Sequence, residues 1–372
     1  MRTRQEFGLM RRRLPSGMSV YYYWIYDESN RRIYRSTGQR TKALALDYVL
    51  KRRDAGMLGR KDRSMTVLSD FAGDFFISGR CPIERNAHMR GRSMTLATCA
   101  VRRKALTAHI LPHLGSLPVS GITRARVNQW LMDLPAKDGI NRSTANTVLV
   151  TLRLVMAQAV REGLLPFNPC DNVENLGSDS VRRASFTTEE VRRIIGRKED
   201  WDDPRVRLMC LTASVTGMRI GEIRALRTDC ITGTAIHVRA SYSDLDGYKT
   251  PKNGRDRVAP VPAGLRMELR NTAPGKGGYV FSVSGDEPLP YPNIRRALIR
   301  RLKALGISGR TFHSFRAFFN TEMMAANVNE TVVRAVVGHQ SAEMTEHYLH
   351  LETGNFSQIR KVQNNLMQQI LA

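Results

Sequence analysis

The residues best suited to chemistry lie in the second half of the chain. His313 and Arg316 form an H-x-x-R pair, His339 follows a glycine, and Tyr348 comes nine residues after His339. A further arginine, Arg219, lies upstream in the run TGMRIGEIRAL. Together, arginine, histidine and tyrosine can bind an anion, transfer a proton and supply a nucleophile.

Such a set suits cleavage of a phosphodiester. Negative charge develops on the non-bridging oxygens in the transition state, and each preorganised donor there is worth about 3–4 kcal/mol by analogy with oxyanion holes. Arg219 and Arg316 can supply such donors because a guanidinium binds two oxygens at once and stays protonated. Tyr348 is the candidate nucleophile, since a phosphotyrosine retains the energy of the broken bond for religation.

The two histidines are candidates for proton transfer and phosphate binding. His313 lies three residues before Arg316, which places both on one face of a helix. It can accept the phenol proton or hydrogen-bond a non-bridging oxygen. His339, at an expected helix end, can donate to the phosphate. Only about 0.1% of an ordinary tyrosine is phenolate at pH 7, so Tyr348 needs help from these neighbours.

The composition indicates a nucleic-acid partner. The 372 residues include 58 Lys and Arg against 34 Asp and Glu, a net charge of +24. This excess favours a polyanion, and no apolar run approaches the about 18 residues of a membrane helix. The five cysteines are scattered and form no C-x-x-C pair, which predicts reduced thiols. The N-terminus is basic and has no apolar stretch behind it. Together these features predict a cytoplasmic, nucleoid-associated protein.

The order of these arginines, histidines and tyrosine resembles the catalytic domain of the tyrosine recombinases, the phage integrase family. The resemblance runs from about residue 186 to the C-terminus. It implies that Tyr348 attacks the scissile phosphate, forming a 3′-phosphotyrosyl link and a free 5′-hydroxyl. A hydroxyl from the partner duplex then reverses the step, and two rounds exchange the strands through a Holliday junction.

The resemblance also assigns roles to residues that spacing alone does not single out. A lysine on a β-hairpin would protonate the leaving 5′-oxygen. Lys252, beside the Asn253-Gly254 turn, fits the family spacing best, and Lys249 is the alternative. Glu222 resembles an acidic position that orients the first arginine, although a plain helix-surface glutamate would look the same.

Periodicity and resemblance together predict a multidomain, mainly α-helical chain with small β-sheets. Residues 1–63 are expected to form an arm-type DNA-binding domain, a small sheet plus one helix. Residues 64–176 are expected to form a helical core-binding bundle. Residues 177–372 are expected to form an α+β catalytic domain with a C-terminal tail, after a polar linker near residues 176–184.

The first domain should hold strands over residues 20–29 and 31–39 and a helix over 41–56. The bundle should hold helices over 66–79, 95–115, 122–134 and 141–169, with Thr123 and Ser143 as N-caps. The basic residues expected to contact DNA are Arg31, Arg32 and Arg35 in the first domain and Arg102, Arg103 and Lys104 in the second. A basic hairpin that only packs, and an ordinary helical bundle, are the alternatives.

The catalytic domain should open with a capping box, Thr187 or Thr188 followed by Glu190. A buried helix over 206–217, strands over 235–243 and 257–261, and helices over 292–306, 314–328 and 330–338 should follow. The tail from residue 355 should form an amphipathic helix that docks on a neighbouring protomer.

No metal or other cofactor is expected. The histidines around Tyr348 have no carboxylate or thiol at ligand spacing, and the transferred chemistry needs no metal. The glycines near residue 277 lack the spacing of a phosphate-binding loop.

The resulting hypothesis is a site-specific recombinase that integrates or excises a phage or another mobile element. The expected partners are double-stranded DNA at core and arm sites, three further copies of the chain in a tetramer, and a host DNA-bending protein or excision factor. A type IB topoisomerase-like enzyme, a non-catalytic architectural protein or repressor, and a chromosome-dimer resolvase remain as alternatives.

Overall fold

The computed structural model describes residues 6–13, 19–26, 31–54, 58, 66–177, 185–250, 256–275, 277–338 and 356–372. Backbone contacts divide the chain into two units. The first comprises Met1–Met94 with Thr98–Asp179, and the second Thr95–Ala97 with Ser180–Ala372. Among the described residues, buried side chains form two separate hydrophobic cores in the first unit and one in the second.

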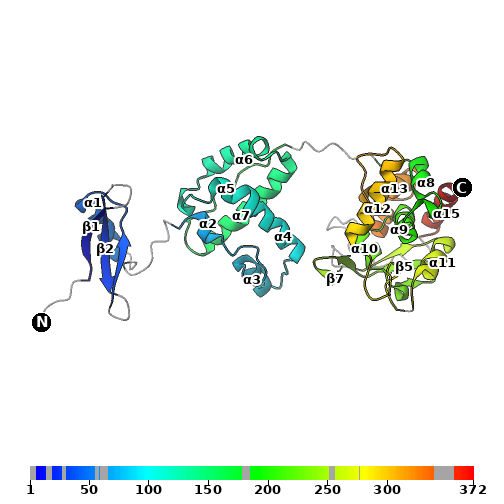
Figure 1. Ribbon diagram of the computed structural model, residues 1–372, viewed down its shortest axis with the longest axis horizontal. Coiled ribbons are helices and arrows are strands. Elements are labelled where there is room, and N and C mark those ends of the chain that lie inside the picture. Colours follow the sequence, from blue (N-terminus) through cyan, green and yellow to red (C-terminus); the bar gives the residue numbers. More distant parts are fainter. Residues whose placement is uncertain are drawn as a thin grey trace. The chain divides into compact units, whose positions relative to one another are not determined.

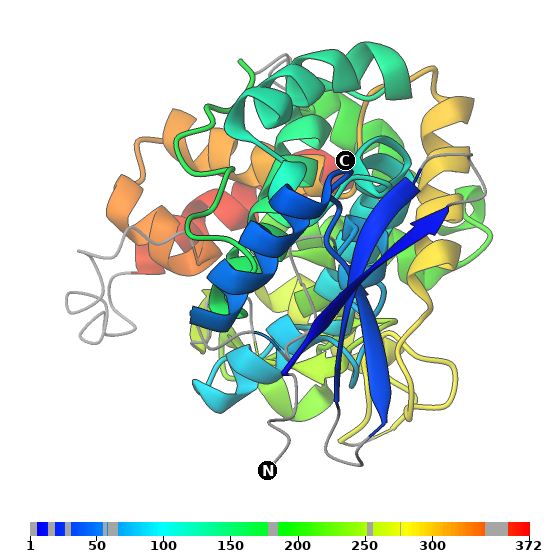
Figure 2. The ribbon, with the colours of Figure 1, turned by 90° about the vertical axis from the view of Figure 1, so that its left-hand side faces the viewer.

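The N-terminal part is a three-stranded antiparallel sheet in the order β1-β2-β3, followed by one helix (Figure 2). Its elements are β1 (Gly8–Arg13), β2 (Ser19–Tyr26), β3 (Arg32–Ser36) and α1 (Lys42–Asp54). Two strands and the helix were predicted, and β1 was not. Tyr23 and Ile25 of β2 and Val49 of α1 are buried together, so α1 covers one face of the sheet.

The rest of the first unit is a helical bundle around its own core. Its elements are α2 (Leu68–Phe71), α3 (Pro82–Met89), α4 (Leu96–Ala105), the π-helical turn η2 (Leu106–Ile110), α5 (Leu111–Leu114), the 3₁₀ turn η3 (Val119–Gly121), α6 (Arg124–Asp138) and α7 (Arg142–Arg161). The expected helix over 66–79 is only the single turn α2, and α3 was not predicted. Thr123 caps α6, as predicted, but Asn141 rather than Ser143 caps α7, because the Asn141 side chain accepts from the N–H of Thr144.

The second unit is built around a helix that is buried along almost its whole length. This helix, α9 (Pro204–Thr216), packs against α8, α13 and α15 (Figure 1). Thr187 and Glu190 form the predicted capping box at the start of α8. The helices are α8 (Thr188–Ile195), α9, α10 (Ile220–Arg224), α11 (Ala263–Thr272), α12 (Tyr291–Ala304), α13 (His313–Ala325), α14 (Glu330–Val337) and α15 (Ser357–Leu371), with the 3₁₀ turns η4 (Lys198–Asp200) and η5 (Thr228–Cys230).

The strands of this unit form two small sheets. One has the order β4-β5-β8 and the other is the β6-β7 hairpin. Their bounds are β4 (Ile231–Thr232), β5 (Ala235–Val238), β6 (Ser241–Ser243), β7 (Gly247–Lys249) and β8 (Arg257–Pro260). Mainly helical parts with small antiparallel sheets are the predicted fold class.

The C-terminal helix α15 packs within its own unit. Ile359, Leu366 and Ile370 join the core of the second unit. Gln363 is fully buried, and its Nε2 donates to the carbonyls of Val215 (3.0 Å) and Pro260 (2.8 Å). The amphipathic helix was predicted correctly. In this single chain its apolar face is covered in cis, and its docking on a neighbouring protomer stays a prediction.

No helix among the described residues combines the length and apolar character needed to cross a membrane.

Candidate active site and nucleic-acid interface

Arg219 follows a tight turn at the end of α9. Gly217 has φ of 66°, in the left-handed region that glycine adopts without penalty. A Cβ on Gly217 would lie 2.5 Å from Cδ1 of Phe319, so only glycine fits this turn. The turn brings Arg219 to the N-cap position of α10.

Glu222 holds Arg219 at the start of α10. Its Oε2 accepts from the backbone N–H of Arg219 (2.7 Å), and its Oε1 accepts from Nη1 (3.0 Å). This matches the orienting position implied by the resemblance. Arg257 donates to the same carboxylate through Nη1 (2.8 Å) and Nη2 (2.6 Å), so Glu222 joins two arginines from different elements.

The charge on Glu222 is held by these partners. Burial raises the pKa of its carboxyl, but the hydrogen bond and charge of Arg257 and the backbone N–H and charge of Arg219 outweigh burial. The net pKa of Glu222 therefore lies below its ordinary value, and the group is a carboxylate at neutral pH.

Arg316 is a buried cation. It lies on α13, is 2% exposed, and donates through Nη1 to Gly217 O (2.7 Å) and through Nη2 to Val337 O. Burial lowers its pKa to about 9; the charge of Arg219 acts in the same direction and Glu222 opposes it. Within the described part of the chain, its buried Nε has no hydrogen-bond partner. Arg316 stays charged at neutral pH and has donor capacity to spare.

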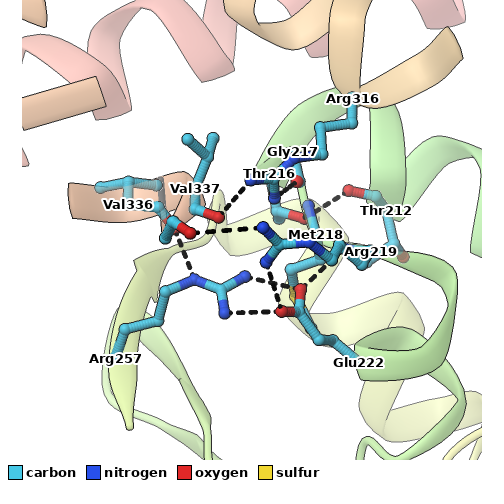
Figure 3. Close-up of polar contacts among 11 residues, drawn as sticks. Thr212, Thr216, Gly217, Met218, Arg219, Glu222, Arg257, Arg316, Val336 and Val337 are labelled. Carbon is cyan, nitrogen blue, oxygen red and sulfur yellow. Dashed lines mark hydrogen bonds and ion pairs between the residues drawn. The ribbon is translucent and has the colours of Figure 1, made fainter. Parts of the chain in front are cut away.

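Three arginines meet at the end of α14 (Figure 3). The pairs are Arg257 Nε with Val336 O (2.8 Å), Arg316 Nη2 with Val337 O, and Arg219 Nη2 with Gly338 O (3.3 Å). The last carbonyls of a helix have no partner within it and carry the negative end of its dipole. We call these three arginines, Glu222 and the three carbonyls the arginine–carbonyl cluster.

The structure brings together only part of the predicted catalytic set. Arg219 and Arg316 belong to the arginine–carbonyl cluster, and His313 is the exposed first residue of α13, one turn before Arg316. His339 and Tyr348 lie outside the described residues, one and ten positions after the end of the cluster at Gly338.

The lysine candidates lie between β7 and β8. Lys252 is outside the described residues. Lys249 ends β7, and its Nζ lies 2.6 Å from Oδ2 of Asp246. This ion pair engages Lys249 within the hairpin, and the choice of Lys252 stays a prediction.

Sequence reasoning missed Arg257. It is one of many basic residues near the expected hairpin, and no local pattern separates it from them. Its partners Glu222 and Val336 are 35 and 79 residues away.

The open face of the N-terminal sheet is aromatic and basic. Side chains alternate across a strand, so Tyr22, Trp24 and Tyr26 lie opposite the face that α1 covers. Arg32 pairs with Tyr26, and its guanidinium carbon lies 4.3 Å from the Trp24 ring centroid. Arg12 lies on β1, the strand that was not predicted, and its guanidinium carbon lies 5.6 Å from the Tyr22 ring centroid.

The three arginines predicted to bind DNA here do not share that face. Arg35 pairs with the buried Tyr23, so alternation places it on the α1 side, where its Nε is buried without a hydrogen-bond partner among the described residues. Arg31 precedes β3 and is exposed. Of the three, Arg32 has the clearest place on the open face.

The predicted basic cluster in the helical bundle is also divided. Arg103 Nη1 donates to the carbonyls of Gly73 (2.8 Å) and Phe75 (3.1 Å) and so fixes the chain after α2. Arg102 is half-buried 6.0 Å from the Phe76 ring centroid, and burial lowers its pKa. Lys104 is exposed and is the member best placed to meet a phosphate.

Parts of this sequence are similar to known proteins. Residues 184–354 match the model of the phage integrase family. The ICEBs1 integrase of Bacillus subtilis is 26% identical over 174 residues, which are 43% of this chain and 47% of that protein. A tyrosine recombinase of Pseudothermotoga lettingae is 22% identical over 257 residues, 66% of this chain and 84% of that protein. The chain thus spans about half the length of the first relative and most of the second.

Solved structures show the same fold. A lambda integrase tetramer bound to a Holliday junction matches with a TM-score of 0.58 and 18% identity, over 89% of this chain and 95% of that one. The Tn1549 transposon integrase in complex with transposon right end DNA matches with a TM-score of 0.59 and 17% identity, over 78% and 98%. The fold is therefore the one found in these integrases, and residues 184–354 are the part of the chain that matches the phage integrase family.

Replacing Glu222 by glutamine should destabilise the second unit by about 3–5 kcal/mol at pH 7, because it leaves buried arginines without their carboxylate. The pKa of Glu222 is lower in the folded than in the unfolded chain. Its contribution is therefore fully present above the unfolded pKa of about 4.5 and is lost as the pH falls through the folded value. The difference in the free energy of unfolding between wild type and Glu222→Gln should be constant from about pH 5 to 8 and should become smaller below that range.

This gap can be measured by urea unfolding followed by Trp201 fluorescence in a Trp24→Phe/Trp130→Phe background, so that only the second unit reports. Glu189→Gln, in an exposed pair with Arg192, is the control and should change stability by less than about 0.5 kcal/mol. Equal stability of the two variants at pH 7, or a gap unchanged at pH 3, would contradict this account of Glu222.

Proposed function

We propose that the chain is a site-specific DNA recombinase that cuts and rejoins DNA through a 3′-phosphotyrosyl intermediate and integrates or excises a phage or other mobile element. The arginine–carbonyl cluster is the observation that carries this proposal. It gathers three arginines, of which Arg316 is buried, around a single carboxylate, directly before the segment that holds His339 and Tyr348 in the sequence. Such a site requires an anion, and a DNA phosphate supplies one.

In the cleavage step, the Tyr348 phenol oxygen forms a bond to phosphorus and the bond from phosphorus to the 5′-oxygen breaks. Arg219 and Arg316 bind the non-bridging oxygens, where charge develops. His313, exposed one turn before Arg316, accepts the phenol proton or binds one of these oxygens. The reverse reaction, with a 5′-hydroxyl from the partner duplex, rejoins the strands.

Two further side chains complete the proposed set. Lys252 donates a proton to the leaving 5′-oxygen, which would otherwise depart as an alkoxide. His339 donates a hydrogen bond to the phosphate. In the sequence it directly follows Gly338, whose carbonyl accepts a hydrogen bond from Arg219 at the end of α14.

The proposed division of labour follows the three predicted domains. Residues 1–63 bind arm-type sites through the open sheet face, residues 64–176 bind the core site, and residues 177–372 hold the active site. Four copies act together on two core sites, through a Holliday junction, at the bacterial nucleoid. A host DNA-bending protein or an excision factor assists. Two weak DNA sites on one tether would gain affinity by effective concentration.

No observation favours the alternatives. A topoisomerase-like enzyme would use the same chemistry on one duplex, but the chain matches integrases over most of its length. A non-catalytic DNA-binding protein would have no use for a buried arginine with unused donor capacity.

A nicked duplex that carries the element's own junction should give a covalent protein–DNA complex that survives denaturation. Tyr348→Phe should abolish the complex, and Arg219→Ala or Arg316→Ala should slow its formation by about 10²- to 10³-fold. Arg192→Ala, in an exposed pair on α8, should react like wild type. Gel electrophoresis in SDS measures all four variants.

A complex that forms equally well with Tyr348→Phe would show that another residue attacks. If wild type forms the complex, a two-site assay for recombinant product separates a recombinase from a topoisomerase-like enzyme, because only the recombinase exchanges partners.

The open sheet face generates a separate prediction. The double variant Arg12→Ala/Arg32→Ala should bind a duplex from the flank of the element's end about 10-fold more weakly. It should also lower the slope of log affinity against log salt by about 2, since two phosphate contacts are lost. Arg35→Ala, on the covered face, is the matched control and should bind within about 2-fold of wild type. Fluorescence anisotropy over a salt series makes the comparison, and equal losses in both variants would rule out the assigned face.

A further inference from the structure

Arg257 makes contacts that link several parts of the proposed active site. It is the first residue of β8, and its side chain is 11% exposed. Two of its nitrogens donate to Glu222 and the third, Nε, to Val336 O. Each of the three nitrogens therefore already has a protein acceptor, and the side chain is not presented to a substrate.

The contrast with Arg219 defines its role. The Arg219 side chain is 27% exposed, and its bond to Gly338 O is long at 3.3 Å, so a phosphate can compete for it. Arg257 holds Glu222 with two short bonds and lies almost out of reach of solvent. It acts on the site through other residues.

The strand that carries Arg257 is itself fixed. Arg257 pairs with Val238 in the antiparallel β5-β8 ladder. On the other side of Lys252, the β6-β7 hairpin is docked on α10. A Cβ on Gly221 would lie 2.5 Å from Ser241 Oγ, and Arg224 forms an ion pair with Asp244. The segment that contains Lys252 therefore lies between two anchored elements, the β6-β7 hairpin and β8. Arg257 is the first residue of the second of these elements.

The end of α14 rests on the same side chain. Gly338 has φ of 69°, and a Cβ built on it would lie 3.2 Å from Cδ of Arg257. Glycine therefore lets the helix end pack against the arginine stem. His339 is the next residue, so Arg257 fixes the point from which the segment of His339 and Tyr348 leaves the helix.

We propose that Arg257 is a positioning residue for strand cleavage. Its bonds to Glu222 position Arg219, and its place on β8 positions the segment that contains Lys252. Its bond to the carbonyl of Val336 positions the end of α14. This inference rests on the proposed function. Lysine cannot replace Arg257, because a single ammonium group cannot reproduce a planar fork together with the bond from Nε.

The test uses the full chain with Arg257→Met, Arg257→Lys and, as matched control, Arg266→Met, a half-buried arginine that also bonds a backbone carbonyl. The substrates are the nicked junction duplex and the same duplex with sulfur as the 5′-bridging atom. Sulfur leaves without a proton, so it bypasses the general acid. DNA affinity and the rate of covalent complex formation are measured for each.

Arg257→Met and Arg257→Lys should bind DNA within about 3-fold of wild type but cleave the all-oxygen duplex about 10²-fold more slowly, the cost of a displacement on the order of 1 Å. On the sulfur duplex the deficit should shrink by at least about 10-fold, because Lys252 is no longer needed. Arg266→Met should match wild type on both. Cleavage at the wild-type rate, an equal deficit on both substrates, or a wholesale loss of DNA affinity would each overturn the proposal.

Hydrogen exchange provides a readout that does not depend on cleavage. Arg257→Met should raise exchange in β7, in β8 and at the end of α14 together, and leave the centre of α9 protected. Unchanged exchange in these elements would refute the positioning role. If wild type forms no covalent complex on either duplex, the proposed function fails, and exchange alone then decides the role of Arg257.

Discussion

The gathering of three arginines around one buried carboxylate is the constraint on which the rest of the catalytic unit depends. Arg219, Arg257 and Arg316 each donate to a carbonyl at the end of α14, and Glu222 is the carboxylate bonded to two of them. Burial first, and then the charges of Arg219 and Arg257, lower the pKa of Arg316, so bringing these cations together has a cost. The helix dipole and Glu222 offset part of that cost. A DNA phosphate would offset the remainder, so the free site is poised for its substrate.

The end of α9 also supports the arginine–carbonyl cluster. The end of α9 has carbonyls without helical partners, and two residues far along the chain bind them. Gln363 of α15 donates to Val215 O, and Arg316 of α13 donates to Gly217 O. The C-terminal helix α15 and Arg316 therefore both bind the turn that precedes Arg219. A displacement of α15 would also displace Arg219 through this turn.

The sequence predicted best what depends on local pattern. Residue types and order singled out Arg219 and Arg316, which the structure brings together, and cap signals located the starts of α6 and α8. The sequence did not predict the roles of residues whose partners are distant along the chain. Arg257 is defined by Glu222 and Val336, and the role of Arg103 by carbonyls about thirty residues earlier. Arg32 and Arg35 look equivalent in sequence, and only the position of α1 assigns them to opposite faces of the sheet.

The most direct test of the central claim is a crystal structure of Tyr348→Phe bound to an intact duplex that contains the element's junction. The account predicts one phosphate whose non-bridging oxygens accept hydrogen bonds from Arg219 and Arg316, while Arg257 still binds Glu222 and Val336. A phosphate bound elsewhere, or Arg257 released from Glu222 to contact DNA, would contradict it.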